Sequence, residues 1–411
     1  MSRRTPISGC VVLAACLALV TPARADVVTD WNEIAVNLTN AANRPAPAWL
    51  LDVVMVHIAM HDAVQAYQHR FDTYNDPITG ASGSVVVAAA TAARDVLLNR
   101  FPSQAGVINS TYTSYLSGKG LLPTDAGAAI GEEAADRIVV RRANDGSYPA
   151  VPEVFTGGTG AGEWRPTQPA FNVPMAAPWM GQVEPFSIRR EELLGESPPP
   201  ELSSDEYAAA YNEVKALGGR TGSTRTTAQT QMAMFYSGNF LTILSRVMRD
   251  VASADVTDIG DSARLFALAY MAASDAAIST WRNKRHFNFW RPSTAIVNGN
   301  SDGNPNTDAD SQWLPLINDP PYPDYTSGAN ALTGSILRTL WRYFGDKVSF
   351  TAHTTVAGLA PRPYTRFSQM ADDVVEARIF LGIHFRFADT VARRQGFQSA
   401  DWAFSHELRA R

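Results

Sequence analysis

Apolar residues recur at three- and four-residue intervals along most of this chain, whereas alternating runs of β-branched residues are scarce. This spacing predicts an all-α protein made of helical bundles, arranged as two packed halves that each resemble a four-helix bundle. We expect helices near residues 29–42, 48–69, 83–100, 123–143, 204–217, 226–251, 260–284, 328–344, 367–384 and 389–408.

A Pro- and Gly-rich segment from Tyr148 to Leu202 interrupts the helical pattern. It is too long for an ordinary connection, and irregular segments of this length usually line sites or wrap surfaces. We therefore expect an N-terminal helical half over residues 26–203, including this loop, and a C-terminal half over residues 204–411 that carries the chemistry.

The first 25 residues have the features of a secretory signal peptide: arginines, an apolar stretch, and Ala23-Arg24-Ala25 before Asp26. We expect an exported protein, periplasmic or secreted. A lipoprotein anchor at Cys16 is the alternative. Both cysteines lie within residues 1–25, so cleavage would leave no thiol or disulfide. No later segment is apolar for the roughly 20 residues that a membrane span needs.

The net charge of −5 and the lack of a basic tract argue against a nucleic-acid partner. Any anion site must therefore depend on local charge. The run KRHFNFWRP supplies two such charges, Lys284 and Arg291, and Lys is rare in this chain. An ammonium and a guanidinium converging on one oxyanion suit phosphate-like recognition. The alternative is a solvated basic helix end, with Pro292 opening the next helix.

Two further elements follow downstream. Ser327 and Gly328 precede an apolar helix, whose free N–H groups would favour an anion, although the pair could also be an ordinary N-cap. Arg378 lies six residues before His384, which we expect late in an apolar helix. These two are about 120° apart around a helix, so only the reach of Arg would let both contact one ligand. A buried structural histidine is the alternative.

Taken together, Lys-x6-Arg-Pro, Ser-Gly and Arg-x5-His resemble the motifs of the vanadium-dependent haloperoxidase and type-2 phosphatidic acid phosphatase (PAP2) superfamily. The likeness is strongest in ARLFALAYMAASDAAISTWRNKRHFNFWRPSTAI and PPYPDYTSGA, which look like the bacterial haloperoxidase branch. The N-terminal VHIAMHDAVQAY also looks like bacterial members.

The resemblance implies a helical bundle that holds vanadate, or phosphate in the same site. His384 would be the vanadium ligand or the nucleophile that attacks phosphorus. Hydrogen peroxide and a halide, or a phosphate ester, would be the substrates, and Lys284 would polarise the bound peroxide. The residues implied to neutralise the oxyanion are Lys284, Arg291, Ser327, Gly328 and Arg378. Trp281 and Tyr322 match positions around the halide, with plain packing as the alternative.

One position departs from the family pattern. The family has an acid–base histidine directly after Ser-Gly, and this chain has Ala329 there. The carboxylate partner of that histidine aligns loosely with Asn239, so both members of the pair are replaced. Losing a general acid–base costs about 10²–10⁴-fold in rate. Asp389 is a further candidate for orienting His384, or a first-turn Asp of the last helix.

Other signals favour structural roles. His57 and His61 have a spacing that can bind zinc, but buried hydrogen-bonded histidines fit better. The segment DGNPNTDAD lacks the glutamate of a calcium loop and reads as a polar loop. Three hypotheses remain: a haloperoxidase, a phosphatase or phosphotransferase using His384, and a degenerate oxyanion-binding protein. The oligomeric state stays open, with a homodimer as one option.

Overall fold

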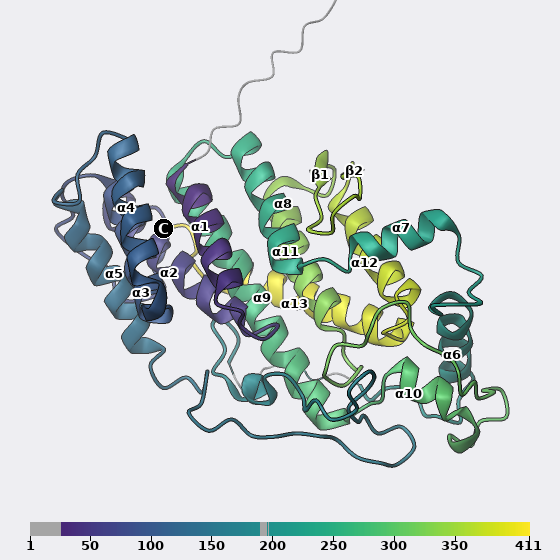
Figure 1. The fold of residues 1–411 in the computed structure, drawn as a ribbon. Helices are drawn as coiled ribbons and strands as arrows, with labels where there is room; N and C mark the ends of the chain where they lie inside the picture. The colour runs from purple at the N-terminus through teal and green to yellow at the C-terminus, as the bar shows by residue number, and fades with distance from the viewer. Residues whose placement is uncertain (1–25, 190–194, 196) are drawn as a thin grey trace, which may run out of the picture.

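The computed structural model describes residues 26–189, 195 and 197–411, so the predicted signal peptide lies outside the described residues. The protein is mostly helical with few strands, which confirms the predicted all-α class (Figure 1). In the N-terminal half the α-helices are α1 (Val27–Ala41), α2 (Trp49–Gln68), α3 (Val85–Arg100), α4 (Ala105–Gly118) and α5 (Gly127–Arg141). The C-terminal half contains α6 (Asp205–Leu217), α7 (Thr227–Phe235), α8 (Phe240–Asp255), α9 (Ile259–Phe287), α10 (Pro292–Val297), α11 (Gly328–Phe344), α12 (Phe367–Phe380) and α13 (Arg386–His406).

Three helix predictions were wrong in detail. Helix α4 was missed, and it buries only Ile108, Tyr112 and Leu116. The stretch 226–251 forms two helices, because the chain turns at Gly238 and Asn239 begins α8 with its side chain accepting from the Thr242 amide at 3.1 Å. The stretch 367–384 ends at Phe380.

The early end of α12 has a clear backbone cause. Gly382 has φ +78°, a left-handed conformation that suits glycine, and a Cβ there would collide with the Gly218 carbonyl oxygen. The prediction that His384 lies late in a helix is therefore wrong. His384 lies in the non-helical connection between α12 and α13.

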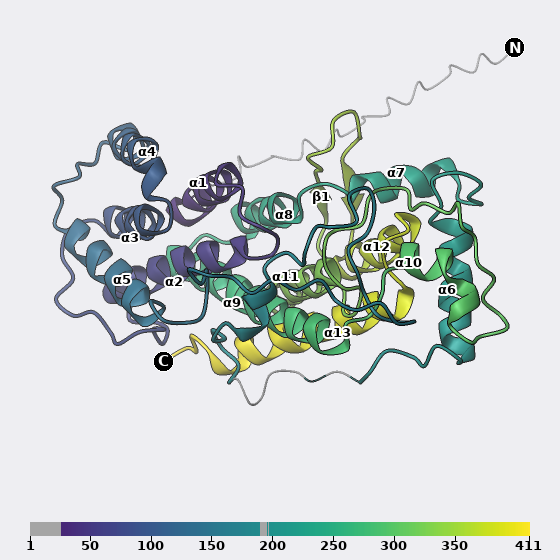
Figure 2. The same ribbon diagram turned by 60° about the horizontal axis from the view of Figure 1, so that its bottom comes forward.

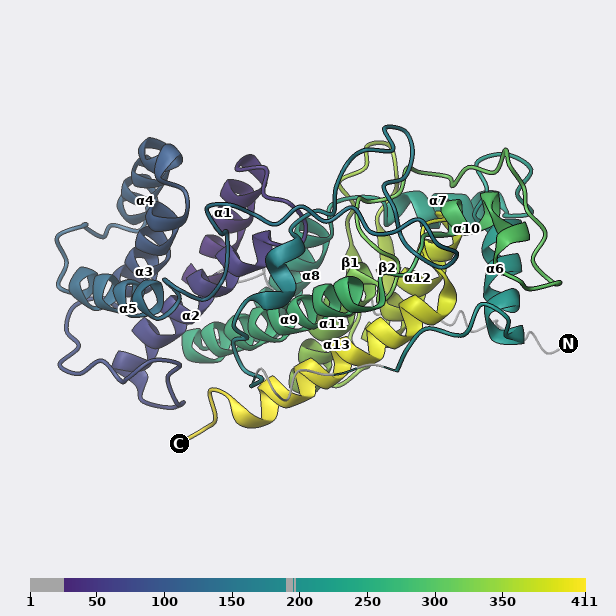
Figure 3. The same cartoon turned by 90° about the horizontal axis from the view of Figure 1, so that it is seen from below.

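Helix α9 is the central element of an elongated molecule (Figures 1 and 2). It packs against α2 on the N-terminal side and against α11 and α13 on the C-terminal side. Helices α3, α4 and α5 form one end of the molecule, and α6 and α10 form the other. Seen from below, α9 and α13 run side by side along the long axis (Figure 3). The largest cluster of buried apolar residues extends from Val27 to Leu408, so the two halves share a core.

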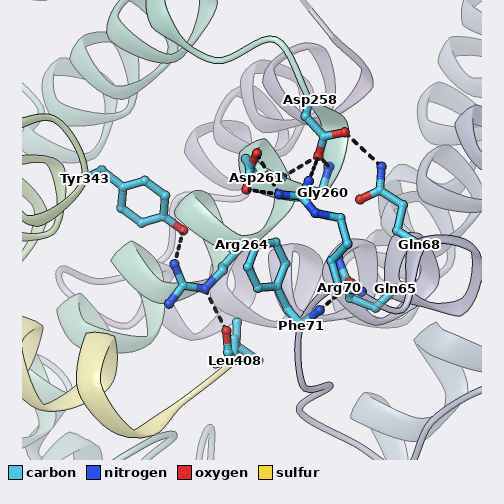
Figure 4. A network of polar contacts seen from close by, with 10 residues as sticks. All are labelled: Gln65, Gln68, Arg70, Phe71, Asp258, Gly260, Asp261, Arg264, Tyr343 and Leu408. Atoms are coloured by element: carbon cyan, nitrogen blue, oxygen red, sulfur yellow. Dashed lines mark hydrogen bonds and ion pairs between the residues drawn. The ribbon is translucent and has the colours of Figure 1, made fainter. Parts of the chain in front are cut away.

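A polar network fastens the ends of several helices together (Figure 4). Arg70, just after α2, pairs with Asp258 and Asp261 at the start of α9. Arg264 of α9 donates to the Leu408 carbonyl oxygen at 2.6 Å and to the Tyr343 hydroxyl at 2.9 Å. The C-terminal segment is thus tied to α9 and α11.

A small antiparallel hairpin, β1 (Phe350–Ala352) and β2 (Arg362–Tyr364), interrupts the helical pattern. Most of the long segment between α5 and α6 is irregular apart from the 3-10 helix η2 (Pro178–Gln182), which packs on α9. Within residues 26–189, 195 and 197–411, none of the helices combines the length and apolar character needed to cross a bilayer.

Candidate active site

Lys284 lies in the last turn of α9 and is fully buried. The helix stops at Asn288, whose left-handed φ of 47° turns the chain toward α10. The ammonium donates to the carbonyl oxygens of Pro323 at 2.6 Å and Asp324 at 3.0 Å. These contacts exclude the alternative of a solvated helix end for this lysine.

Arg291 is the N-cap residue of α10, ahead of Pro292 at the first helical position, as predicted. Its side chain is fully buried. Nε donates to the Tyr322 carbonyl oxygen at 2.8 Å, and Nη1 donates to the Ile383 carbonyl oxygen at 2.6 Å. The guanidinium therefore joins the segment before α11 to the segment before α13.

His384 meets this guanidinium directly. Nη1 of Arg291 lies 3.1 Å from His384 Nε2. The same Nη1 atom lies 3.4 Å from Nδ1. Because it contacts both ring nitrogens, it does not fix which of them carries the proton. Because His384 is in a connection and not on α12, its separation from Arg378 no longer depends on helical geometry.

Asp324 is a member of the cluster that sequence reasoning missed. Its Oδ1 atom lies 2.7 Å from His384 Nδ1, and both side chains are buried. The oxygen lies off the N–H direction, so this is a close electrostatic contact rather than an aligned hydrogen bond. The sequence signal for Asp324 was that it is the lone acid in the Pro-rich run PPYPDY. A carboxylate that is buried there requires a charged partner or a hydrogen-bond donor.

Within this cluster, two buried guanidinium N–H groups have no hydrogen-bond partner among the described residues. They are Nη2 of Arg291 and Nε of Arg378. Arg378 is 6% exposed, and its Nη1 makes a long contact of 3.4 Å with the Tyr236 carbonyl oxygen. Orphaned buried donors are rare and costly, and a multiply charged oxyanion would satisfy both. The donor set therefore fits vanadate or phosphate.

Ser327 is the N-cap residue of α11, and Gly328 is its first helical residue, as predicted. The Ser327 side chain makes no capping hydrogen bond within the described helix, so it does not act as an ordinary N-cap. Asp389 of α13 accepts from Asn330 at 2.8 Å. It therefore supports the start of α11, and Asp324 occupies the place beside His384 for which Asp389 was a candidate.

The predicted pocket residues line one cavity of about 210 Å³. Its lining includes Trp281, Tyr322, Gly328 and Arg378. Ala329 and Asn239, the positions of the replaced acid–base pair, line the same cavity. The Trp281 and Tyr322 rings lie 4.9 Å apart, and the Lys284 ammonium lies 4.8 Å from the Tyr322 ring centroid. Lys284, Arg291, Ser327 and His384 are not among the lining residues. Lys284 and Arg291 lie behind the Tyr322 wall, each 4.8 Å from its ring centroid.

Burial dominates the electrostatics of the cluster. Burial, with Arg291, Lys284 and Arg378 nearby, lowers the pKa of His384 well below its usual value, so the imidazole is neutral at neutral pH. Burial and Arg291 also lower the pKa of Lys284, while Asp324 and Asp389 oppose that shift. Burial raises the pKa of Asp324, against Arg291 and Lys284. A bound oxyanion would stabilise the charged form of the ammonium.

The two N-terminal histidines are engaged within the bundle. His57 Nε2 lies 2.9 Å from Asn32 Nδ2, and the ring stacks on Tyr270. His61 Nε2 donates to the Asp72 carbonyl oxygen at 3.0 Å. Burial lowers their pKa values to about 3 and about 4. The contacts of His57 and His61 are therefore those of buried structural histidines, as predicted.

The Gly328→Ala variant is expected to be less stable than the wild type by about 1–3 kcal/mol, the usual cost of overpacking. A Cβ at this position would lie 2.9 Å from Cζ3 of the buried Trp281. Gly106→Ala on α4 is the matched control, since a Cβ there meets nothing within 4 Å. Urea unfolding of both variants measures the effect. A Gly328→Ala protein as stable as the wild type would show that Trp281 has room to move.

The chain is similar in sequence to vanadium chloroperoxidases. Residues 264–410 match the family model described as the VCPO second helical-bundle domain. A vanadium chloroperoxidase from Curvularia inaequalis is 27% identical over 288 residues. The match covers 53% of this chain and 46% of that relative, so it spans less than half of the relative's length.

Solved structures show the same fold. A bacterial vanadium-dependent iodoperoxidase matches 93% of this chain and 96% of its own, with a TM-score of 0.78 and 22% identity. The holo-type structure of a bacterial vanadium-dependent chloroperoxidase matches 90% of this chain and 92% of its own, with a TM-score of 0.70 and 17% identity. The fold is therefore that of the vanadium haloperoxidases, and the resemblance inferred from the motifs is confirmed.

Proposed function

We propose that the protein is a vanadate-binding, haloperoxidase-like enzyme that oxidises a halide with hydrogen peroxide. The observation that carries this proposal is the buried His384 in contact with Arg291, within a cluster whose buried guanidinium N–H groups lack partners. Vanadate would supply a Lewis acid that activates peroxide while the oxidation state of vanadium stays the same.

The chain's own residues would hold the oxyanion and exclude water. His384 would offer an imidazole nitrogen as the ligand, and Arg291 and Arg378 would offer the N–H groups that lack partners. Lys284 stays within the cluster through its two carbonyl contacts and, once charged, would polarise an oxygen of the bound group. Trp281 and Tyr322 close one side of the cavity.

A phosphatase is the second candidate, because the same donors and the same imidazole suit a phosphate group. His384 would attack phosphorus in line as the ester oxygen leaves. A degenerate oxyanion-binding protein is the third, and Ala329 in the lining of the cavity favours it.

One set of assays tests these functions. Purified protein is titrated with orthovanadate by calorimetry, and bromide and iodide oxidation is then measured with and without vanadate. Oxidation that requires vanadate supports the haloperoxidase. Phosphate-ester hydrolysis alone supports the phosphatase, and binding without either reaction supports the third candidate.

We further expect Asp324 to position His384. Asp324→Ala removes the carboxylate beside Nδ1 and is expected to weaken vanadate binding by about 10–100-fold, as is usual for partners one step removed from a metal. Asp324→Asn keeps an oxygen of the same size at this place without the charge, and a positioning role predicts that it retains most of the affinity. Calorimetry with vanadate measures both, with thermal unfolding to check the fold. Equal losses in the two variants would indicate a role for the charge and not for positioning.

A further inference from the structure

The cavity beside the oxyanion cluster is larger than halide and peroxide require. Its volume of about 210 Å³ compares with the roughly 150 Å³ of an apolar cavity that holds benzene. Three of its lining residues, Trp49, Phe240 and Tyr322, are only half-buried. These rings leave apolar surface facing the cavity, a feature that marks binding sites for apolar groups.

The cavity has an asymmetric lining. Arg378 is its only charged lining residue among those described, and the Gly328 backbone lies at the start of α11 beside it. The other walls are mostly apolar, including Trp281 and Leu332. A ligand that matches this lining has an anionic end toward Arg378 and an apolar end among the rings.

Two cations lie close to aromatic rings that line this space. The Arg378 guanidinium carbon lies 5.6 Å from the Phe240 ring centroid, and the Lys284 ammonium lies 4.8 Å from that of Tyr322. The indole of Trp281 is fixed by a hydrogen bond of 3.0 Å to the Ala176 carbonyl oxygen. The Trp281 wall is therefore held in place before any ligand arrives, which reduces the entropic cost of binding.

Both halves of the chain contribute to the cavity. Trp49 opens α2, whereas the other aromatic walls come from the C-terminal half. Ala329 lines the cavity with a single methyl group, so this position leaves room for a ligand. Replacement of the acid–base histidine thus has a second consequence, which is space beside the oxyanion.

We propose that this cavity binds a planar aromatic ring next to the bound oxyanion. The inference rests on the proposed oxyanion site. The ring could be joined to the anion, as in an aryl phosphate, or belong to a separate phenol that is the organic acceptor. Stacking against aromatic walls supplies the affinity in both cases.

Calorimetry with phenylphosphonate and methylphosphonate tests the proposal, since the P–C bonds of these ligands resist hydrolysis. Phenylphosphonate is expected to bind about tenfold more tightly than methylphosphonate, from two or more aromatic contacts. Trp49→Ala should lower this ratio toward one, and Ala329→Leu should do the same by filling the space. Trp402→Ala, a half-buried tryptophan of α13 that stacks on His406, is the matched control and should keep the ratio.

A phenol titration in saturating phosphate separates the two sources of the ring. Binding of phenol that Trp49→Ala abolishes indicates a separate acceptor, and selective binding of phenylphosphonate alone indicates an ester. If both phosphonates bind equally tightly and phenol does not bind, the aromatic site is refuted while the oxyanion site stands. If neither phosphonate nor phosphate binds, the proposed function itself fails.

Discussion

The double variant Ala329→His, Asn239→Asp is expected to oxidise halide about 10²–10⁴ times faster than the wild-type protein, the usual contribution of a general acid–base. Both positions line the cavity that also contains Gly328 and Arg378. A histidine at position 329 would therefore face the bound group, and a carboxylate at position 239 would lie on the same cavity to orient it.

The fold should tolerate these changes. Ala329 and Asn239 are not in the closely packed core. Asn239 is the N-cap residue of α8, and Asp is an equally good N-cap. The cost is the hydrogen bond of 2.9 Å from Asn239 to Asn40. This contact is exposed, so we expect its loss to be small.

Steady-state peroxidase assays at saturating vanadate measure the gain, with the two single variants as controls. Ala329→His alone should give part of the increase, and Asn239→Asp alone should give none, because a carboxylate without its histidine has nothing to orient. A folded, vanadate-loaded double variant with unchanged turnover would show that the missing pair does not limit the rate.

The sequence was most informative where local chemistry determines structure. Lys284 at a helix end, Pro292 at a first helical position and Ser327 before α11 follow from helix periodicity and capping preferences, and the structure has all three there. These positions depend only on neighbouring residues. Lys284, Pro292 and Ser327 also belong to the motifs that carried the family resemblance.

Contacts between distant segments were harder to predict. His384 was placed on a helix because residues 367–384 are apolar, but the left-handed Gly382 against Gly218 ends α12 early. Asp324 was overlooked because nothing near it in sequence indicates that it meets His384, sixty residues later. Trp49 likewise reaches the cavity only through packing of α2 on α9.

These distant contacts also explain why the cluster is costly to build. Lys284, Arg291, Asp324 and His384 are all buried, and burial shifts the pKa of Lys284, Asp324 and His384 toward the neutral form. Charges are buried at high cost unless they are paired. A bound oxyanion would pair the cations, so occupancy of the site should stabilise the whole fold.

The His384→Ala variant is expected to lose halide oxidation entirely and to bind vanadate more than about 100-fold more weakly, because even indirect partners of a metal contribute about 10–100-fold. Phosphate binding should weaken less, since Arg291 and Arg378 remain to neutralise its charge. His286→Ala, which removes an exposed imidazole at the end of α9, is the matched control. Calorimetric titration of each variant with vanadate and with phosphate measures the difference. Equal losses for the two anions would mean that His384 makes no bond specific to vanadium, and undiminished vanadate binding would contradict its role as the ligand.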